Sequence, residues 1–265
     1  MELKTYLDII DKKTLHVVGI CAVAVWLCRE FDFSYDMDWI FLGAAVVFPL
    51  VFTIKQSFQR RERALRMLSQ FKASMHAFYR TVMGSTRIDD TFRLHVTEVF
   101  GRLSSIFLTR LKGDADASME ESREAMRAVH RIISAEDSPL GNRTALKLVR
   151  VVQDLEEALE ELNAIKSHRT PVSMRAYLLL SIYIVPFILT PTLSHYLTGK
   201  PIELVFALSS LNGFILISLY NVQAHLEDPF DQRGLDDIHL NEFEFEPDFS
   251  VSTNVSATDA GGAPA

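Results

Sequence analysis

Cysteine is scarce in this sequence. Only two cysteines are present, Cys21 and Cys28, and their spacing within one apolar segment places them on a single face of a helix. Two cysteines are too few to build a disulfide framework or a cysteine-rich zinc site. We therefore expect neither a disulfide-stabilised fold nor a zinc-binding module.

An excess of positive charge is also missing. Lysine and arginine together number 27 against 34 acidic residues, which gives a formal net charge of −7 at pH 7. Proteins that bind nucleic acid present a basic surface to the phosphate groups. The charge balance therefore argues against a nucleic-acid partner, and no nucleic-acid-binding motif is found.

No recognisable catalytic set is present. The eight histidines lie without metal-ligand spacing to one another or to a cysteine. No glycine-rich phosphate loop or nucleophile elbow occurs. The four glutamates at 156, 157, 160 and 161 recur at helical spacing, which is typical of a solvated helix face. We predict that the protein is not an enzyme and uses no cofactor.

Long apolar segments are what the sequence does contain. There are four, at residues 14–28, 39–54, 176–196 and 202–220. A helix that spans a bilayer needs about 20 apolar residues, so the third segment is long enough, whereas the first two are short. Because the segments come in two pairs, we predict four transmembrane helices. The first pair could instead form a buried hairpin in a soluble protein.

The basic residues indicate the orientation of these segments. The link between the first two segments carries four acids and a single arginine. Basic residues instead precede the first segment, follow the second and precede the third; they are Lys12, Lys13, Lys55, Arg60, Arg61, Arg63, Arg66, Lys166, Arg169 and Arg175. By the positive-inside rule, we expect a multi-pass protein of the cell membrane with both termini and the central region in the cytoplasm.

The central region has the pattern of packed helices. Apolar residues recur mostly at spacings of three and four, at Ala64, Leu65, Leu68, Phe71, Met75 and Phe78. We therefore expect the second apolar segment to continue as one long helix as far as Gly84. Further helices are predicted over 91–111, 119–135 and 144–166. The last of them has the clearest apolar stripe, at Leu148, Val152, Leu155, Leu159 and Leu162.

These patterns divide the chain into five parts. We expect an N-terminal transmembrane pair at 1–57, a cytoplasmic helical region at 58–173 and a C-terminal transmembrane pair at 174–224. An acidic cytoplasmic strap follows at 225–249. The tail at 250–265 is rich in small and polar residues and cannot bury enough surface to offset its ordering entropy, so we expect it to be disordered.

Two stretches of the sequence carry a family resemblance. The first, Phe48-Pro49-Leu50-Val51-Phe52 followed by Gln56, is similar to the segment that lines the narrow hydrophobic neck of the bestrophin family of pentameric ion channels. The second, at residues 226–240, contains Asp228-Pro229-Phe230-Asp231 and is similar to the family's Asn-Pro-Phe-Gly motif with its acidic continuation. The resemblance extends in layout over about residues 1–242, and in length the chain is closer to the bacterial type of this family.

The resemblance implies a fold class and a set of partners. The fold would be an all-α membrane protein with four transmembrane helices, a helical cytoplasmic insertion and assembly into a ring-forming oligomer. The partners would be further copies of the same chain, as a homo-oligomer that the family makes a pentamer, together with the lipid bilayer and small inorganic ions.

Helix geometry gives a reason, independent of the resemblance, to consider a neck at this segment. Phe48, Phe52 and Gln56 lie at i, i+4 and i+8, close to one stripe of a helix. Repeated around an axis, such helices stack rings of phenyl groups, and a dehydrated constriction of this kind gates by dewetting. Pro49 is tolerable because neighbouring helices can satisfy the carbonyl that it frees. The alternative is that both phenylalanines simply face lipid or pack against neighbours.

The charges near the two ends of this helix favour ions of opposite sign. Asp36 and Asp38 precede its outer end and would concentrate cations, whereas Lys55 follows the neck and would favour anions. The resemblance includes both chloride channels and cation-passing bacterial members. We expect a channel for small ions, anions such as chloride. A monovalent cation channel of the same fold, or a non-conducting membrane scaffold that binds a cytoplasmic partner, stays open.

The acidic motif carries a possible calcium site. In calcium-regulated members of the family it helps to form a cation clasp, and carboxylates at Asp228, Asp236 and Asp237 are hard oxygen ligands of a suitable type. The match is imperfect, because Asp228 and Asp231 replace the family's Asn and Gly, and residues 232–234 interrupt the acidic run. We interpret the segment as a structural strap that packs Phe230 against the cytoplasmic helices, without a metal.

A membrane enzyme would require a polar cluster within the predicted spans. Glu203, Asn212 and His195 are the candidates there, and each is isolated or close to a helix end. Buried asparagines in membrane helices commonly hydrogen-bond across helices. We therefore expect Asn212 to link two helices rather than to take part in chemistry.

Overall fold

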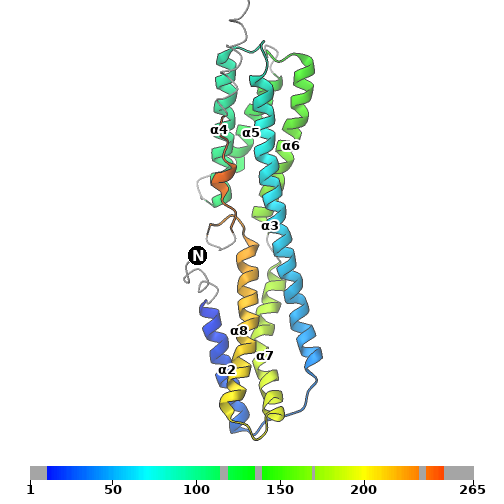
Figure 1. Cartoon of the computed structure of the whole chain (residues 1–265), viewed down its shortest axis with the longest axis vertical. Coiled ribbons are helices and arrows are strands. Elements are labelled where there is room, and N and C mark those ends of the chain that lie inside the picture. The colour runs from blue at the N-terminus through cyan, green and yellow to red at the C-terminus, as the bar shows by residue number, and fades with distance from the viewer. Residues whose placement is uncertain (1–10, 114–118, 135–138, 169–170, 233–236, 248–265) are drawn as a thin grey trace, which may run out of the picture. The chain divides into compact units, whose positions relative to one another are not determined.

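A computed structural model of the chain describes residues 11–113, 119–134, 139–168, 171–232 and 237–247 (Figure 1). These ranges contain seven α-helices and one short 3-10 helix, and no strand. The predicted all-α architecture is therefore confirmed for the described residues. The chain forms two compact units.

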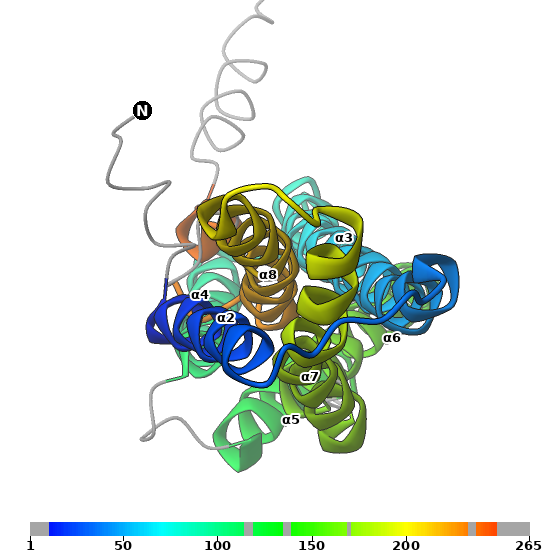
Figure 2. The ribbon, with the colours of Figure 1, turned by 90° about the horizontal axis from the view of Figure 1, so that it is seen from below.

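The first unit is built from four helical segments. They are α2 (Lys12–Glu30), the first part of α3 (Trp39–Met83), α7 (Val172–Tyr196) and α8 (Ile202–Glu227). Helices α2, α7 and α8 pack against one another, as the view along them in Figure 2 shows. The first part of α3 joins the same apolar core through Val46 and Leu50.

Gly213 permits the close approach of α8 to α2. A Cβ atom at this position would lie 2.7 Å from Cγ1 of Val17 and 3.1 Å from Sγ of Cys21, both on α2. Small residues at membrane helix interfaces let two backbones come near enough for dense packing. The glycine is therefore a packing requirement of this unit.

Two helices of the first unit are long and apolar enough to cross a membrane. They are α7 and α8, and only 28% of the most apolar 18-residue stretch of either is buried within the chain. A core helix of a soluble protein buries most of its residues, so this exposure favours a lipid or subunit environment. The two shorter segments predicted to span are helical too, in α2 and α3, and their membrane crossing stays a prediction.

Both helices of this apolar pair extend beyond the segments predicted from sequence. Helix α7 begins at Val172, directly after Pro171, and α8 continues to Glu227. Proline suits the start of a helix because its φ angle is already helical. The α8 helix stops before Pro229 because a proline disfavours helical backbone in the residue that precedes it, and Asp228 has φ −116° and ψ 88°. Residues 225–227, predicted as strap, are therefore helical.

The second unit contains the remainder of α3 and three further helices. These are α4 (Asp90–Lys112), α5 (Met119–Ser134) and α6 (Asn142–Ser167). As predicted, α3 is one long helix of 45 residues that ends directly before Gly84. The side chain of Asp89 caps the start of α4, and Gly113 ends that helix with a φ of 93°, a conformation that glycine adopts without strain.

The core of the second unit follows the predicted stripes. Five α3 side chains of the stripe are fully buried, at Ala64, Leu68, Phe71, Met75 and Phe78, whereas Leu65 is only partly buried. The α6 stripe from Leu148 to Leu162 is buried as well. The Phe71 ring lies 5.2 Å from that of Phe107, and the Phe78 ring lies 5.0 Å from that of Phe100. Aromatic pairs at such distances add to the burial energy.

A strap after α8 completes this core. Phe230, Ile238, Leu240 and Phe245 are buried in it. The backbone N–H of Phe245 donates to Oγ of Ser104 at 2.9 Å, and Nζ of Lys72 donates to the Glu242 carbonyl at 2.7 Å. The acidic segment is thus held by apolar anchors and backbone hydrogen bonds. The tail at 250–265, which we predicted to be disordered, lies outside the described residues.

Candidate pore-lining site

The first part of α3 has two distinct faces. Val46, Leu50, Thr53 and Ser57 are buried against the unit's own core. Phe48 and Phe52 lie on the opposite side and are 63% and 60% exposed. Gln56, about one turn further along the helix, is exposed as well. The three residues proposed to line a neck therefore form one outward stripe, which a single chain leaves uncovered.

Pro49 interrupts the hydrogen bonding of α3 within this stripe. It has no N–H to donate to the carbonyl of Ala45, four residues earlier. The hydroxyl of Tyr177, on α7, donates to that carbonyl at 2.9 Å. The freed carbonyl is thus satisfied by a neighbouring helix, the arrangement that makes a proline tolerable within a membrane helix.

The link before α3 is fastened to α7. The Tyr35 hydroxyl donates to the carbonyl of Ile188 at 3.0 Å, and the Tyr196 hydroxyl donates to Oδ1 of Asp36 at 2.6 Å. Oδ1 of Asp38 accepts the backbone N–H of Ile40 at 3.0 Å, near the start of α3. The two predicted pore-mouth carboxylates thus lie together before α3, while Lys55 is exposed farther along the same helix.

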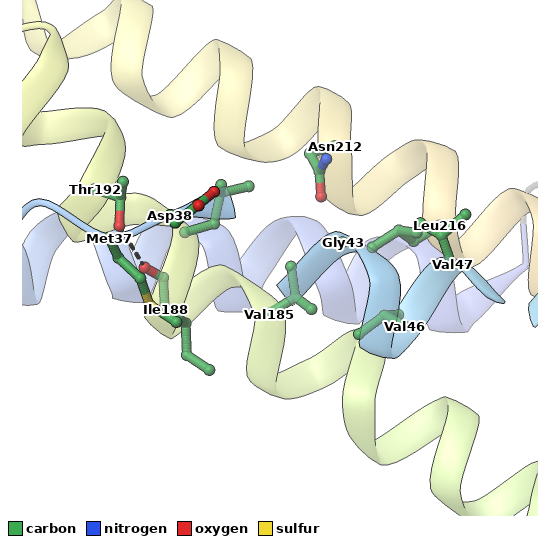
Figure 3. A pocket seen from close by; sticks show the side chains of 11 residues that line it. Met37, Asp38, Gly43, Val46, Val47, Val185, Ile188, Thr192, Asn212 and Leu216 are labelled. Atoms are coloured by element: carbon green, nitrogen blue, oxygen red, sulfur yellow. Dashed lines mark hydrogen bonds between the residues drawn. The ribbon is translucent and has the colours of Figure 1, made fainter. Parts of the chain in front are cut away.

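A cavity of about 80 Å³ lies between the start of α3 and helices α7 and α8 (Figure 3). Its walls are mainly apolar, and Asp38, Thr192 and Asn212 supply its polar groups. Oδ1 of Asn212 is buried, and no described residue donates a hydrogen bond to it. The expectation that Asn212 links two helices is therefore wrong for this oxygen, because it faces a cavity instead of a donor.

A different pair of side chains provides a polar link between α7 and α8. The hydroxyls of Thr190 and Ser209 are buried and lie 2.9 Å apart. Two hydroxyls can satisfy each other inside an apolar bundle without any charge. Sequence reasoning missed this pair, because serine and threonine are common in membrane helices and neither position stands out locally.

Four further polar residues meet within the first unit. Nε2 of Gln223 donates to Oγ of Ser57 at 3.5 Å and to Oε2 of Glu227 at 3.4 Å. Nη1 of Arg175 lies 3.6 Å from Oε2 of Glu227. In the sequence, Arg175 stands out only as a flanking charge, and the i, i+4 spacing of Gln223 and Glu227 is the one local signal of this group.

The residues of the acidic motif are divided between the two units. Asp228 and Pro229 belong to the first unit, whereas Phe230, Asp231 and Asp237 belong to the second. Asp236, one of the three possible calcium ligands, lies outside the described residues. Among the residues that are described, no group of three or more His, Cys, Asp or Glu side chains is placed to hold a metal ion.

The fold is that of known membrane proteins. No protein-family model matches the sequence, and no curated protein matches it. A crystal structure of a bacterial bestrophin homologue from Klebsiella pneumoniae, carrying one substitution, superimposes with a TM-score of 0.71 at 15% identity, over 92% of this chain and 98% of that one. Another crystal structure of a bestrophin homologue from the same organism gives 0.69 at 16% identity, over 92% and 96%. The chain therefore has the fold of the bacterial bestrophin homologues.

Proposed function

We propose that several copies of this chain, five by analogy with the bestrophin family, form a ring in the cell membrane that conducts small ions. Phe48 and Phe52 form the hydrophobic neck of the pore, and Gln56 follows them. The conducted ions are anions such as chloride. Both chain termini and the second unit lie on the cytoplasmic side.

The outward stripe of α3 is the observation that carries this proposal. A soluble protein would not leave two phenylalanines exposed along one line. In a lone membrane bundle the same two side chains would face lipid, and the neck variants described below test that alternative. In a closed ring the same stripe is repeated around the axis. Phenyl groups there make a dry constriction, and the glutamine about one helical turn further along faces the water of the pore.

The single chain has no space for a conducting path of its own. Packed helices leave only small enclosed spaces between them, such as the cavity of about 80 Å³ between the start of α3 and helices α7 and α8, which holds a few water molecules. Conduction therefore requires assembly. The likeness to the bacterial bestrophin homologues supports a ring, since it extends over most of both chains.

Planar-bilayer recording of the purified protein tests the neck. Phe48→Ala and Phe52→Ala each remove a phenyl ring per subunit, so the constriction widens, hydrates more readily and carries a larger unitary current. Phe58→Ala is the matched control, because Phe58 is an exposed phenylalanine of the same helix that lies off the stripe. Currents that are unchanged in both stripe variants would remove the neck assignment.

The mass of the detergent-solubilised particle separates the channel from a scaffold. A mass of five chains supports the ring. A monomer or dimer, together with no ion flux from loaded liposomes, would instead indicate a non-conducting scaffold whose cytoplasmic helices bind a partner. The reversal potential in a salt gradient distinguishes an anion channel from a cation channel of the same fold.

A further inference from the structure

The polar group of Ser57, Arg175, Gln223 and Glu227 joins three helices of the first unit. Ser57 is on α3, Arg175 is on α7, and Gln223 and Glu227 are on α8. The contacts form a series, from Arg175 to Glu227, from Glu227 to Gln223 and from Gln223 to Ser57, at 3.6, 3.4 and 3.5 Å. We call these four residues the polar latch.

Three of the four latch side chains are almost fully buried, although all three are polar. Ser57, Gln223 and Glu227 are 2%, 0% and 3% exposed. Burial of an amide and a carboxylate is unfavourable unless partners compensate it, and a hydrophobic side chain at either position would pack at lower cost. The four residues lie just beyond the ends of the predicted spans at 39–54, 176–196 and 202–220, and a buried polar group at such a place can specify one packing arrangement of the helices.

Its place on α3 suggests what that function is. Ser57 directly follows Gln56, so the latch contacts α3 at the end of the outward stripe of Phe48, Phe52 and Gln56. Along the same helix, Tyr177 holds the Ala45 carbonyl beside Pro49. The proline leaves α3 with one fewer internal hydrogen bond, so the helix can bend there, and contacts on both sides of the proline hold the stripe in its direction.

We propose that the polar latch fixes the rotation of α3 against α7 and α8, and thereby sets how far the stripe projects into the pore. The four latch side chains act as positioning residues, since none of them belongs to the stripe. Arg175 orients the Glu227 carboxylate, Glu227 orients the Gln223 amide one helical turn earlier, and that amide holds the Ser57 hydroxyl. This inference rests on the proposed pore.

A double-mutant cycle on one contact tests the latch. Ser57→Ala removes the hydroxyl, Gln223→Met removes the amide with little change in volume, and the double variant removes both. Gln223→Met also breaks the contact with Glu227, so it should cost more than Ser57→Ala, and the double variant should resemble Gln223→Met alone. We expect Ser57→Ala to lower Tm by about 2–4 °C in the wild-type protein and by almost nothing in the Gln223→Met background, with the unitary conductance following the same pattern.

Ser218→Ala is the matched control. Ser218 lies on the same helix, and its buried Oγ has no hydrogen-bond partner among the described residues, so removal of this hydroxyl breaks no contact. Its Tm and conductance should stay at the wild-type values. A control that shifts as much as the latch variants would mean that loss of any buried hydroxyl from the bundle has this effect, and the latch would be rejected.

Melting temperature and conductance together distinguish a failure of the latch proposal from a failure of the pore proposal. Additive losses of Tm in the double variant would contradict the latch. A conductance that is unchanged in Ser57→Ala and Gln223→Met, but altered in Phe48→Ala, would contradict it as well. Neither result would contradict the proposed pore. A wild-type protein that passes no ions in bilayers removes the proposed function and the latch's control of conductance with it. The melting cycle then still reports whether the contact holds α3.

Discussion

The hydroxyl of Tyr177 donates a hydrogen bond to the carbonyl oxygen of Ala45 at 2.9 Å. Ala45 is the residue whose helical partner would be the N–H of position 49, where the chain has proline. A side chain 132 positions away in the sequence therefore replaces a backbone hydrogen bond of α3. This contact ties the helix that bears the phenylalanine stripe to α7.

Tyr177→Phe should destabilise the first unit by about 1 kcal/mol, because the Ala45 carbonyl loses its donor in a region with little competing water. Thermal unfolding of the purified protein in detergent measures the loss. In a Pro49→Ala background the same substitution should cost almost nothing, because the new N–H at position 49 bonds Ala45 within the helix. Equal losses in both backgrounds would show that the hydroxyl stabilises the protein through some other contact.

Local patterns in the sequence predicted the helices and the buried stripes well. The stripe from Ala64 to Phe78 depends only on the helical repeat, and every stripe side chain except the partly exposed Leu65 is buried as expected. The partner of Asn212 could not be predicted in this way. Whether its oxygen meets a donor or a cavity depends on the register between α8 and the start of α3, which no local repeat contains.

The candidate site likewise contains one feature that the sequence predicts and one that it does not. The line of Phe48, Phe52 and Gln56 follows from their spacing alone, and its exposure agrees with an outward face. The polar latch joins residues from three helices, and its contacts separate Ser57 from Gln223 by 166 positions. Such a group emerges only when the tertiary packing is known, although charged residues inside long apolar helices are a reason to search for one.

Gly213→Ala should destabilise the first unit despite alanine's higher helix propensity. The added Cβ would meet Cγ1 of Val17 at 2.7 Å, and relief of the overlap would separate α2 from α8, at a cost of about 1–3 kcal/mol. Val17→Ala in the same chain should restore most of the lost Tm. Gly19→Ala is the control, because a Cβ there meets nothing within 4 Å. A Gly213→Ala protein as stable as the wild type would contradict the close packing.

Phe230→Ala should destabilise the second unit by about 3–5 kcal/mol, the usual range for truncation of a buried phenylalanine. Phe230 is fully buried, whereas Phe243 in the same strap is only partly buried, so Phe243→Ala should cost clearly less. Thermal melting gives the two losses, and limited proteolysis reports release of the strap. Equal losses would indicate that the motif phenylalanine is not the anchor of the strap.

The pH dependence of the second unit should include a contribution from Glu124. Hydrogen bonds from Arg127 and then from Arg131, on the same face of α5, lower the pKa of this carboxyl. A carboxyl with a lowered pKa in the folded state stabilises the fold above its unfolded-state pKa, and the contribution disappears as the pH falls through the folded value. Because Glu124 is exposed, the effect is small.

Melting curves at neutral and acidic pH measure this contribution. Glu124→Gln should lower Tm slightly at neutral pH and leave it unchanged in acid, where the wild-type carboxyl is protonated as well. Glu98→Gln, at an exposed position of α4, provides the comparison for loss of one surface carboxylate. A Tm difference between Glu124→Gln and wild type that persists in acid would contradict the ion-pair explanation.

Charge substitutions at the two ends of the stripe-bearing segment should move the proposed channel's selectivity in opposite directions. Lys55 is exposed one residue before Gln56, and a ring of such ammonium groups would raise the local anion concentration. Lys55→Gln should therefore shift the reversal potential in a potassium chloride gradient towards that of potassium. Asp36→Asn should shift it towards that of chloride. Lys147→Gln, exposed on α6, is the control for loss of one positive charge. Opposite shifts from the first two variants require both charges to act on the same permeating path, whereas shifts no larger than that of the control would place neither charge on it.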